Sequence, residues 1–110
     1  MEPKFNLWIE NNGDVVLSIW RADLLQAIDS SGSLKKAADE MKIPYKEAQE
    51  KLQEMERGLG VKLLTAPSGE IEKGEIRLTS EGEGLLKQFK EFSAGLEAEI
   101  TERFKKSFRQ

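Results

Sequence analysis

The spacing of apolar side chains near the start of the chain predicts a β-hairpin over residues 4–18. Apolar and polar positions alternate there, which is the period of a half-buried strand, and the apolar members are Phe5, Leu7 and Ile9. Asn12-Gly13 then supplies the dipeptide that best tolerates the positive φ angles of a two-residue turn. Such a turn pairs Ile9 with Val16 and Trp8 with Leu17. We expect the hairpin to cover the core.

The next apolar positions recur every three or four residues, which predicts amphipathic helices over residues 19–30, 34–41 and 45–57. Gly32 suits the position just past the first helix, and Ser33 suits the N-cap of the second. Pro44 is tolerated because it stands at the start of the third helix. The positions expected to be buried are Trp20, Leu24, Leu25, Ile28, Leu34, Ala37, Ala38, Met41, Ala48, Leu52 and Met55. Two short helices joined by a three-residue turn predict a helix-turn-helix over residues 33–57.

The segment after the third helix predicts a wing over residues 61–78. Residues 61–64 and 75–78 have the composition of short strands, and Pro67-Ser68-Gly69 suits a loop between them. A strand, a loop and a returning strand after a helix-turn-helix are typical of a winged helix. The pattern therefore predicts a mainly α-helical fold with a small β component, in which residues 1–79 form one winged helix-turn-helix domain.

A final helix is predicted from residue 80 to about residue 108, so that residues 80–110 form a C-terminal helical element. Thr79 or Ser80 is expected to cap it, with Ser80 and Glu83 as a capping box. A helix of this length spans ~43 Å, which exceeds the core of a small domain. We expect a second copy to cover its apolar stripe, giving a homodimer; the alternative is a break near Gly95 that folds the helix back. The stripe consists of Leu85, Phe89, Phe92, Leu96, Ile100, Phe104 and Phe108.

Composition limits the chemistry open to this chain. Its 110 residues accommodate a single domain, and they include no cysteine and no histidine. Disulfides, zinc sites with Cys or His ligands, and catalysis by a histidine base or cysteine nucleophile are therefore excluded. No nucleophile–base pair or metal cluster can be assembled, so we expect a non-enzyme without metal or cofactor.

Because no apolar run approaches the ~20 residues of a membrane helix and no signal-peptide pattern is present, we expect a cytoplasmic protein.

Charge is distributed unevenly along the chain. The net charge is −3, and residues 1–31 carry two basic and five acidic side chains. Residues 32–64 carry seven basic and six acidic side chains, so the predicted helix-turn-helix has a slightly positive balance. Binding of nucleic acid depends on the local surface rather than on the total charge. This balance is compatible with DNA binding but favours it only weakly.

Residues 32–64, GSLKKAADEMKIPYKEAQEKLQEMERGLGVKLL, resemble the DNA-binding domain of LysR-type regulators, and RLTSEGEGLL over residues 77–86 extends the likeness. A closer resemblance is to the N-terminal domain of ModE-type, molybdate-responsive regulators. The segment FNLWIENNGDVVLSIWRADLLQAI is similar to the hairpin and first helix of that domain. Its Ser-Tyr-Lys-x-Ala-Trp recognition motif and the register beyond it are matched by Tyr45, Lys46, Ala48, Glu54 and Met55. The resemblance implies a dimeric, DNA-binding transcriptional regulator.

The chain departs from the ModE-type pattern in three ways. Pro44 and Gln49 stand where the motif usually has serine and tryptophan. The wing sequence TAPSGEIEKGEIR carries three glutamates, whereas the wing of the family is usually rich in glycine with basic residues. The molybdate-binding domains of full-length members have no counterpart in this sequence, so binding of molybdate is not expected.

A recognition helix presents outward side chains near its N-terminus to the major groove. In residues 45–57 the side chains expected to contact DNA are Tyr45, Lys46, Gln49, Glu50, Gln53 and Arg57. Glutamine suits adenine, lysine suits guanine or phosphate, and glutamate suits cytosine. Ser33, Lys35 and Lys36 begin the preceding helix, where backbone N–H groups and the helix dipole favour a phosphate. Lys73 and Arg77 are the basic residues of the wing, and Arg77 resembles the wing arginines of the LysR group.

The sequence therefore predicts a regulator that binds double-stranded DNA at an inverted repeat as a homodimer, because the two-fold axis of the protein is mirrored in the operator. The alternative is a winged-helix module for protein interaction or dimerisation that has lost DNA binding. The acidic wing and the near-neutral recognition helix favour that alternative. The motif at Tyr45-Lys46 and the retained helix-turn-helix favour the regulator.

Overall fold

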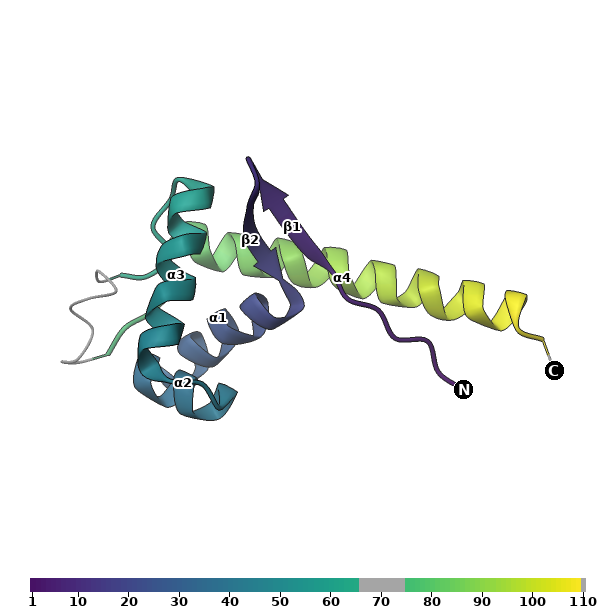
Figure 1. The fold of residues 1–110 in the computed structure, drawn as a ribbon, viewed down its shortest axis with the longest axis horizontal. Helices are drawn as coiled ribbons and strands as arrows, with labels where there is room; N and C mark the ends of the chain where they lie inside the picture. The colour runs from purple at the N-terminus through teal and green to yellow at the C-terminus, as the bar shows by residue number, and fades with distance from the viewer. Residues whose placement is uncertain (66–74, 110) are drawn as a thin grey trace.

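A computed structural model describes residues 1–65 and 75–109 of the chain (Figure 1). The elements follow in the order β1 (Trp8–Asn11), β2 (Asp14–Ser18), α1 (Ile19–Ser31), α2 (Leu34–Met41), α3 (Tyr45–Leu59) and α4 (Ser80–Ser107). The hairpin, α1–α3 and the start of α4 form a small head, from which the rest of α4 extends as a rod. The molecule measures 56 × 29 × 22 Å. This arrangement confirms the predicted winged helix-turn-helix with an N-terminal hairpin and a long C-terminal helix.

The hairpin has the predicted turn but a different register. Asn12 and Gly13 form the turn with φ angles of 52° and 88°. Beyond the turn a β-bulge shifts the pairing by one residue, so the predicted partners of Trp8 and Ile9 are wrong. The observed pairs are Trp8 with Ser18, Ile9 with Leu17, Glu10 with Val15 and Asn11 with Asp14. Val16, which the bulge leaves without a partner across the hairpin, is buried against α3, where a Cβ on Gly58 would stand 2.6 Å from Val16 Cγ1.

Residues 1–7 lie outside the two strands and are named here the N-terminal arm. The prediction of a strand from residue 4 is therefore wrong for this segment, although its alternating pattern is still visible in the burial of its side chains. The backbone carbonyl of Leu7 accepts a hydrogen bond from the N–H of Ile19, at 3.2 Å, which fixes the end of the arm to the head.

The three helices of the head have the predicted positions, and the structure adds Ser18 and Gly60 to the predicted end signals Gly32 and Ser33. Ser18 caps α1, and its hydroxyl accepts a hydrogen bond from the N–H of Arg21 at 2.9 Å. Ser33 caps α2 as predicted. Gly32 and Gly60 end α1 and α3 in the left-handed region, with φ angles of 70° and 71°. Each predicted boundary agrees with the structure to within two residues.

The core of the head contains most of the side chains that helical periodicity assigned to it. Trp20 and Met41 are half-buried at its margin, although both were predicted to be buried. Arg21 is buried, which no apolar pattern indicates. The fully buried large side chains are Val16, Leu24, Leu25, Ile28, Leu34, Leu52, Met55 and Leu63. No helix of the described residues is long and apolar enough to cross a membrane.

The two predicted strands of the wing meet at a single antiparallel bridge, between Leu64 and Leu78. Full strands over residues 61–64 and 75–78 are therefore wrong. Other partners take the backbone groups that longer strands would need: Ile76 donates its N–H to the carbonyl of Gly32, and Leu63 donates to a carboxylate oxygen of Glu56. The predicted loop at Pro67-Ser68-Gly69 lies outside the described residues.

Helix α4 is capped by Thr79 and runs without interruption past Gly95, so the alternative of a break there is wrong. The Thr79 hydroxyl accepts from the N–H of Gly82 at 3.0 Å and donates to the carbonyl of Lys62 at 2.6 Å. Ser80 is the first helical residue, so the predicted capping box is also wrong. Leu86 and Phe89 are buried in the head, and α4 leaves the head beyond Phe89.

Candidate nucleic-acid interface

The N-terminus of α2 has the features of a phosphate-binding helix start. Ser33 is the N-cap of α2, and its hydroxyl accepts a hydrogen bond from the N–H of Lys36 at 3.1 Å. The first turn of any helix leaves backbone N–H groups without intrahelical partners. Lys35 and Lys36 are exposed beside them and form no ion pair within residues 1–65 and 75–109. Both ammonium groups are therefore available to an anion.

The outer side of α3 carries a continuous exposed stripe. Lys46, Glu50, Gln53 and Arg57 follow one another at intervals of three or four residues, and all four are exposed. At 1.5 Å per residue they cover roughly 16 Å of helix, a length that suits the major groove. Gln49 lies beside the stripe and is half-buried.

The stripe is uneven in charge. Lys46, at its N-terminal end, forms no ion pair within the described residues. Arg57, at the other end, lies 4.0 Å from the carboxylate of Asp14 in the hairpin. The end of α3 next to α2 is therefore the end that offers uncompensated positive charge, which is where a recognition helix contacts base edges.

Tyr45 lies on a different side of α3 from this stripe. Its ring packs against the hydrophobic core, and its hydroxyl is buried with no hydrogen-bond partner among the described residues. The residue was predicted to face DNA because it belongs to the motif with Lys46. In the structure Tyr45 instead packs between the start of α3 and the hydrophobic core.

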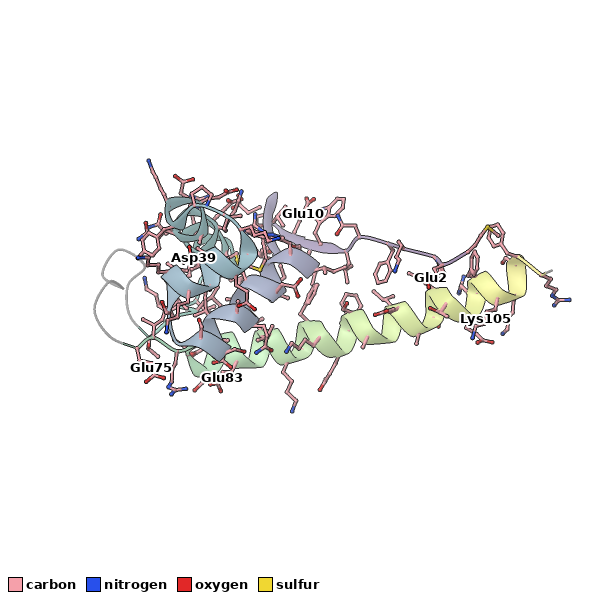
Figure 2. The ribbon with its side chains drawn as sticks, turned by 90° about the horizontal axis from the view of Figure 1, so that it is seen from below. Glu2, Glu10, Asp39, Glu75, Glu83 and Lys105 are labelled. Carbon is pink, nitrogen blue, oxygen red and sulfur yellow. The ribbon has the colours of Figure 1, made fainter. Side chains whose placement is uncertain are left out.

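The segments 63–65 and 75–79, which meet at the Leu64–Leu78 bridge, are named here the root of the wing. In this root Arg77 lies beside Glu75. Its guanidinium lies 2.6 Å from the carboxylate of Glu75, and its backbone is joined to Thr65 by hydrogen bonds in both directions. Figure 2 shows Glu75 at the point where the described chain resumes. The charge of Arg77 is thus largely offset within the root. Lys73, the other predicted basic residue, lies outside the described residues.

Arg21 and Glu56, which the sequence did not single out, and Lys42 of the predicted three-residue turn hold this surface in place. Arg21 of α1 forms an ion pair with Glu54 of α3 at 3.3 Å. Glu56 accepts a hydrogen bond from the N–H of Leu63 at 2.7 Å and thereby fixes the exit from α3. Lys42 turns the chain between α2 and α3 with a φ of 60°. A signal existed for Lys42, because it stands at the left-handed position after a helix that glycine usually fills.

A helix-turn-helix, a third packed helix and the root of a wing, with the outer side of α3 and the two lysines of the first turn of α2 exposed, define a winged-helix fold of the kind that DNA-binding proteins use. Residues 21–83, more than half of the chain, match the bacterial regulatory helix-turn-helix proteins of the lysR family. The chain therefore belongs to the lysR family, a family of DNA-binding transcription regulators. A comparison with curated proteins finds no match to the chain. The predicted LysR-type resemblance is confirmed.

Proposed function

We propose that this protein is a sequence-specific transcriptional regulator of the ModE-like type that binds an inverted-repeat operator as a homodimer. The observation that carries the proposal is the exposed stripe on α3, which has Lys46 at its N-terminal end, together with the exposed lysines Lys35 and Lys36 in the first turn of α2. A stripe on one helix provides side chains for base edges, and the neighbouring helix start provides contacts to the phosphate backbone.

Each group has a distinct role in this proposal. Lys46 reads guanine or contacts a phosphate, Glu50 accepts from the amino group of cytosine, and Gln53 pairs with adenine. Lys35 and Lys36 position the protein on the backbone without reading sequence. Arg77 makes a weaker backbone contact, because Glu75 competes with the phosphate for its guanidinium.

The homodimer is supported by the part of α4 that extends beyond the head. Phe92 is 50% exposed, and it lines an open hollow together with Gly95, Leu96 and Ile100. Soluble proteins rarely leave such a contiguous apolar surface in water. Phe89 and Leu85 contribute less than the sequence predicted, because Phe89 is buried in the head of its own chain and Leu85 packs against that core.

Charged residues around this hollow suit a second copy of the same helix. Glu91, Glu99 and Arg103 line its rim. Two antiparallel α4 helices related by a two-fold axis at Leu96 would place Phe92 of each copy beside Ile100 of the other. The same arrangement brings Arg103 of each copy near Glu91 of the other, so that apolar and charged contacts are satisfied together.

Selection of bound duplexes from a random DNA pool tests the proposal. The expected product is an inverted repeat, and Lys35→Ala with Lys36→Ala should weaken binding to all duplexes alike. Lys87→Ala serves as the matched control, because it removes an exposed lysine from α4 and should leave binding unchanged. Failure of every duplex to compete at about 50 mM salt, where backbone contacts are strong, would overturn the proposal.

A second candidate function is a protein-interaction module without DNA binding. The observation that favours it is the 2.6 Å pairing of Arg77 with Glu75, which removes a cation that a DNA-binding wing would use. Under this candidate the selection enriches no sequence, and the mass of the chain in solution still corresponds to a dimer.

A further inference from the structure

We infer that the N-terminal arm covers one flank of α4 and so leaves a single apolar flank for the second copy. The inference rests on the proposed homodimer and concerns which surface of α4 is available to it. The arm would then limit the assembly to two chains and set the direction from which the second copy approaches.

The arm lies beside the part of α4 that extends from the head. Figures 1 and 2 both show residues 1–7 running from β1 along this part of the helix, and Figure 2 labels Glu2 on the arm and Lys105 near the end of α4. Met1 lines a hollow with Phe104 and Phe108. The arm therefore reaches the last turns of α4.

The burial of the arm alternates as expected for an extended segment with one covered side. Pro3, Phe5 and Leu7 are half-buried, whereas Glu2, Lys4 and Asn6 are exposed. A segment loose in water would show no such alternation, because both sides would be equally accessible. The apolar side of the arm is therefore turned toward the molecule.

The arm and the open hollow occupy different flanks of α4. With 3.6 residues per turn, Ser93 and Phe104 lie about 60° and 80° to one side of Leu96, and Phe92 lies about 40° to the other side. Ser93, Thr101 and Phe104 are half-buried although α4 has left the head. Phe92 is half exposed. The covered flank thus faces the arm, and the open flank contains Phe92, Gly95 and Leu96.

The width of an apolar stripe determines how many helices associate through it. A narrow stripe suits one partner helix, whereas a stripe that continues around the helix favours higher assemblies. Without the arm, Phe104 would extend the open flank beyond Ile100, so that the apolar surface from Phe92 to Phe104 would cover more than 100° around the helix. We therefore expect the arm to prevent assembly beyond the dimer.

Deletion of residues 2–6 tests the inference by multi-angle light scattering at micromolar concentration. The full chain should give a dimer, and the deletion variant should give a species of about twice that mass or larger. Adding Phe104→Glu to the deletion should restore the dimer, because it removes the uncovered flank while Phe92 and Leu96 remain. Circular dichroism confirms that each variant keeps its helices.

Single substitutions in the N-terminal arm test the same inference if the deletion variant does not fold. Phe5→Gln should shift the mass upward, and Asn6→Ala, at the adjacent exposed position, should not. Equal masses for the full chain, the deletion and Phe5→Gln would overturn the inference. A full chain that is monomeric would instead contradict the proposed homodimer, and self-association caused by the deletion would still support the covering role of the arm.

Discussion

Arg21 and Glu54 join α1 to α3 through an ion pair of 3.3 Å between residues that are 33 positions apart. The Arg21 side chain is only 9% exposed, and its Nη1 has no hydrogen-bond partner among the described residues. The pair therefore holds the candidate recognition helix against the head at the cost of a partly unsatisfied buried cation.

Glu54→Ala should destabilise the protein more than Arg21→Met does. The first change leaves a buried guanidinium without its carboxylate and should cost about 2 kcal/mol. The second removes the cation and the unsatisfied Nη1 together, and a methionine side chain fills similar space. Urea unfolding of both single variants and the double variant measures the difference. A larger loss for Arg21→Met would show that Glu54 contributes little to the position of α3.

Gly82→Ala should destabilise the start of α4 because a Cβ there would stand 2.7 Å from the carbonyl oxygen of Leu63. The neighbour is backbone, which cannot rotate away, so we expect a loss of about 2 kcal/mol. Gly84→Ala is the matched control, since an added Cβ would meet nothing within 4 Å. It should stabilise the helix by up to about 1 kcal/mol. Thermal unfolding of the two variants should therefore move in opposite directions.

Glu75→Gln should strengthen binding to DNA by releasing Arg77. In the proposed dimer, Lys35 and Lys36 would provide four backbone contacts, which would give a log–log salt slope of about −4. Two released arginines should steepen that slope to about −5 and raise the affinity for all sequences alike. Titrations of one duplex at several salt concentrations provide the slope. A variant with unchanged slope and affinity would place Arg77 outside the DNA interface.

Replacing Phe92 and Leu96 together with glutamate should give a folded monomer. Each of the two substitutions places a charge on the open flank, and the repulsion between copies prevents that flank from being buried. Ala98→Glu adds a charge at an exposed position on another side of α4 and should leave the dimer intact. Size exclusion with light scattering distinguishes the two results. A double variant that keeps the mass of the wild-type dimer would locate the interface elsewhere.

The helices could be predicted from the sequence because their signals are local. Gly32 and Ser33 act on the residues next to them, so they place the end of α1 and the start of α2. The third helix was predicted to end at residue 57, and in the structure it ends at Leu59, before Gly60. The buried side of α4 could not be predicted in the same way, because Leu85 and Leu86 are both apolar and the sequence does not show which of them faces α1. The structure buries Leu86, and Leu85 is half-buried.

Features that depend on distant residues could not be predicted in this way. The bulge in the hairpin involves Val16, which contacts Gly58 of α3, and the buried Arg21 pairs with Glu54 of α3. Tyr45 shares a motif with Lys46, but the orientation of its ring is set by the core beneath α3. In the candidate site, exposure of Lys35, Lys36 and Lys46 followed from helical periodicity, whereas the pairing of Arg77 with Glu75 did not.

Gly32 ends α1, precedes the cap of α2 and accepts a hydrogen bond from Ile76 at the root of the wing. The end of α1, the start of α2 and the root of the wing are thus connected at one residue of the folded chain. Binding of DNA would not need to organise the α2 start relative to the wing root, because folding has already done so. Calorimetry should accordingly show a small heat-capacity change on binding, without the large unfavourable entropy of coupled folding.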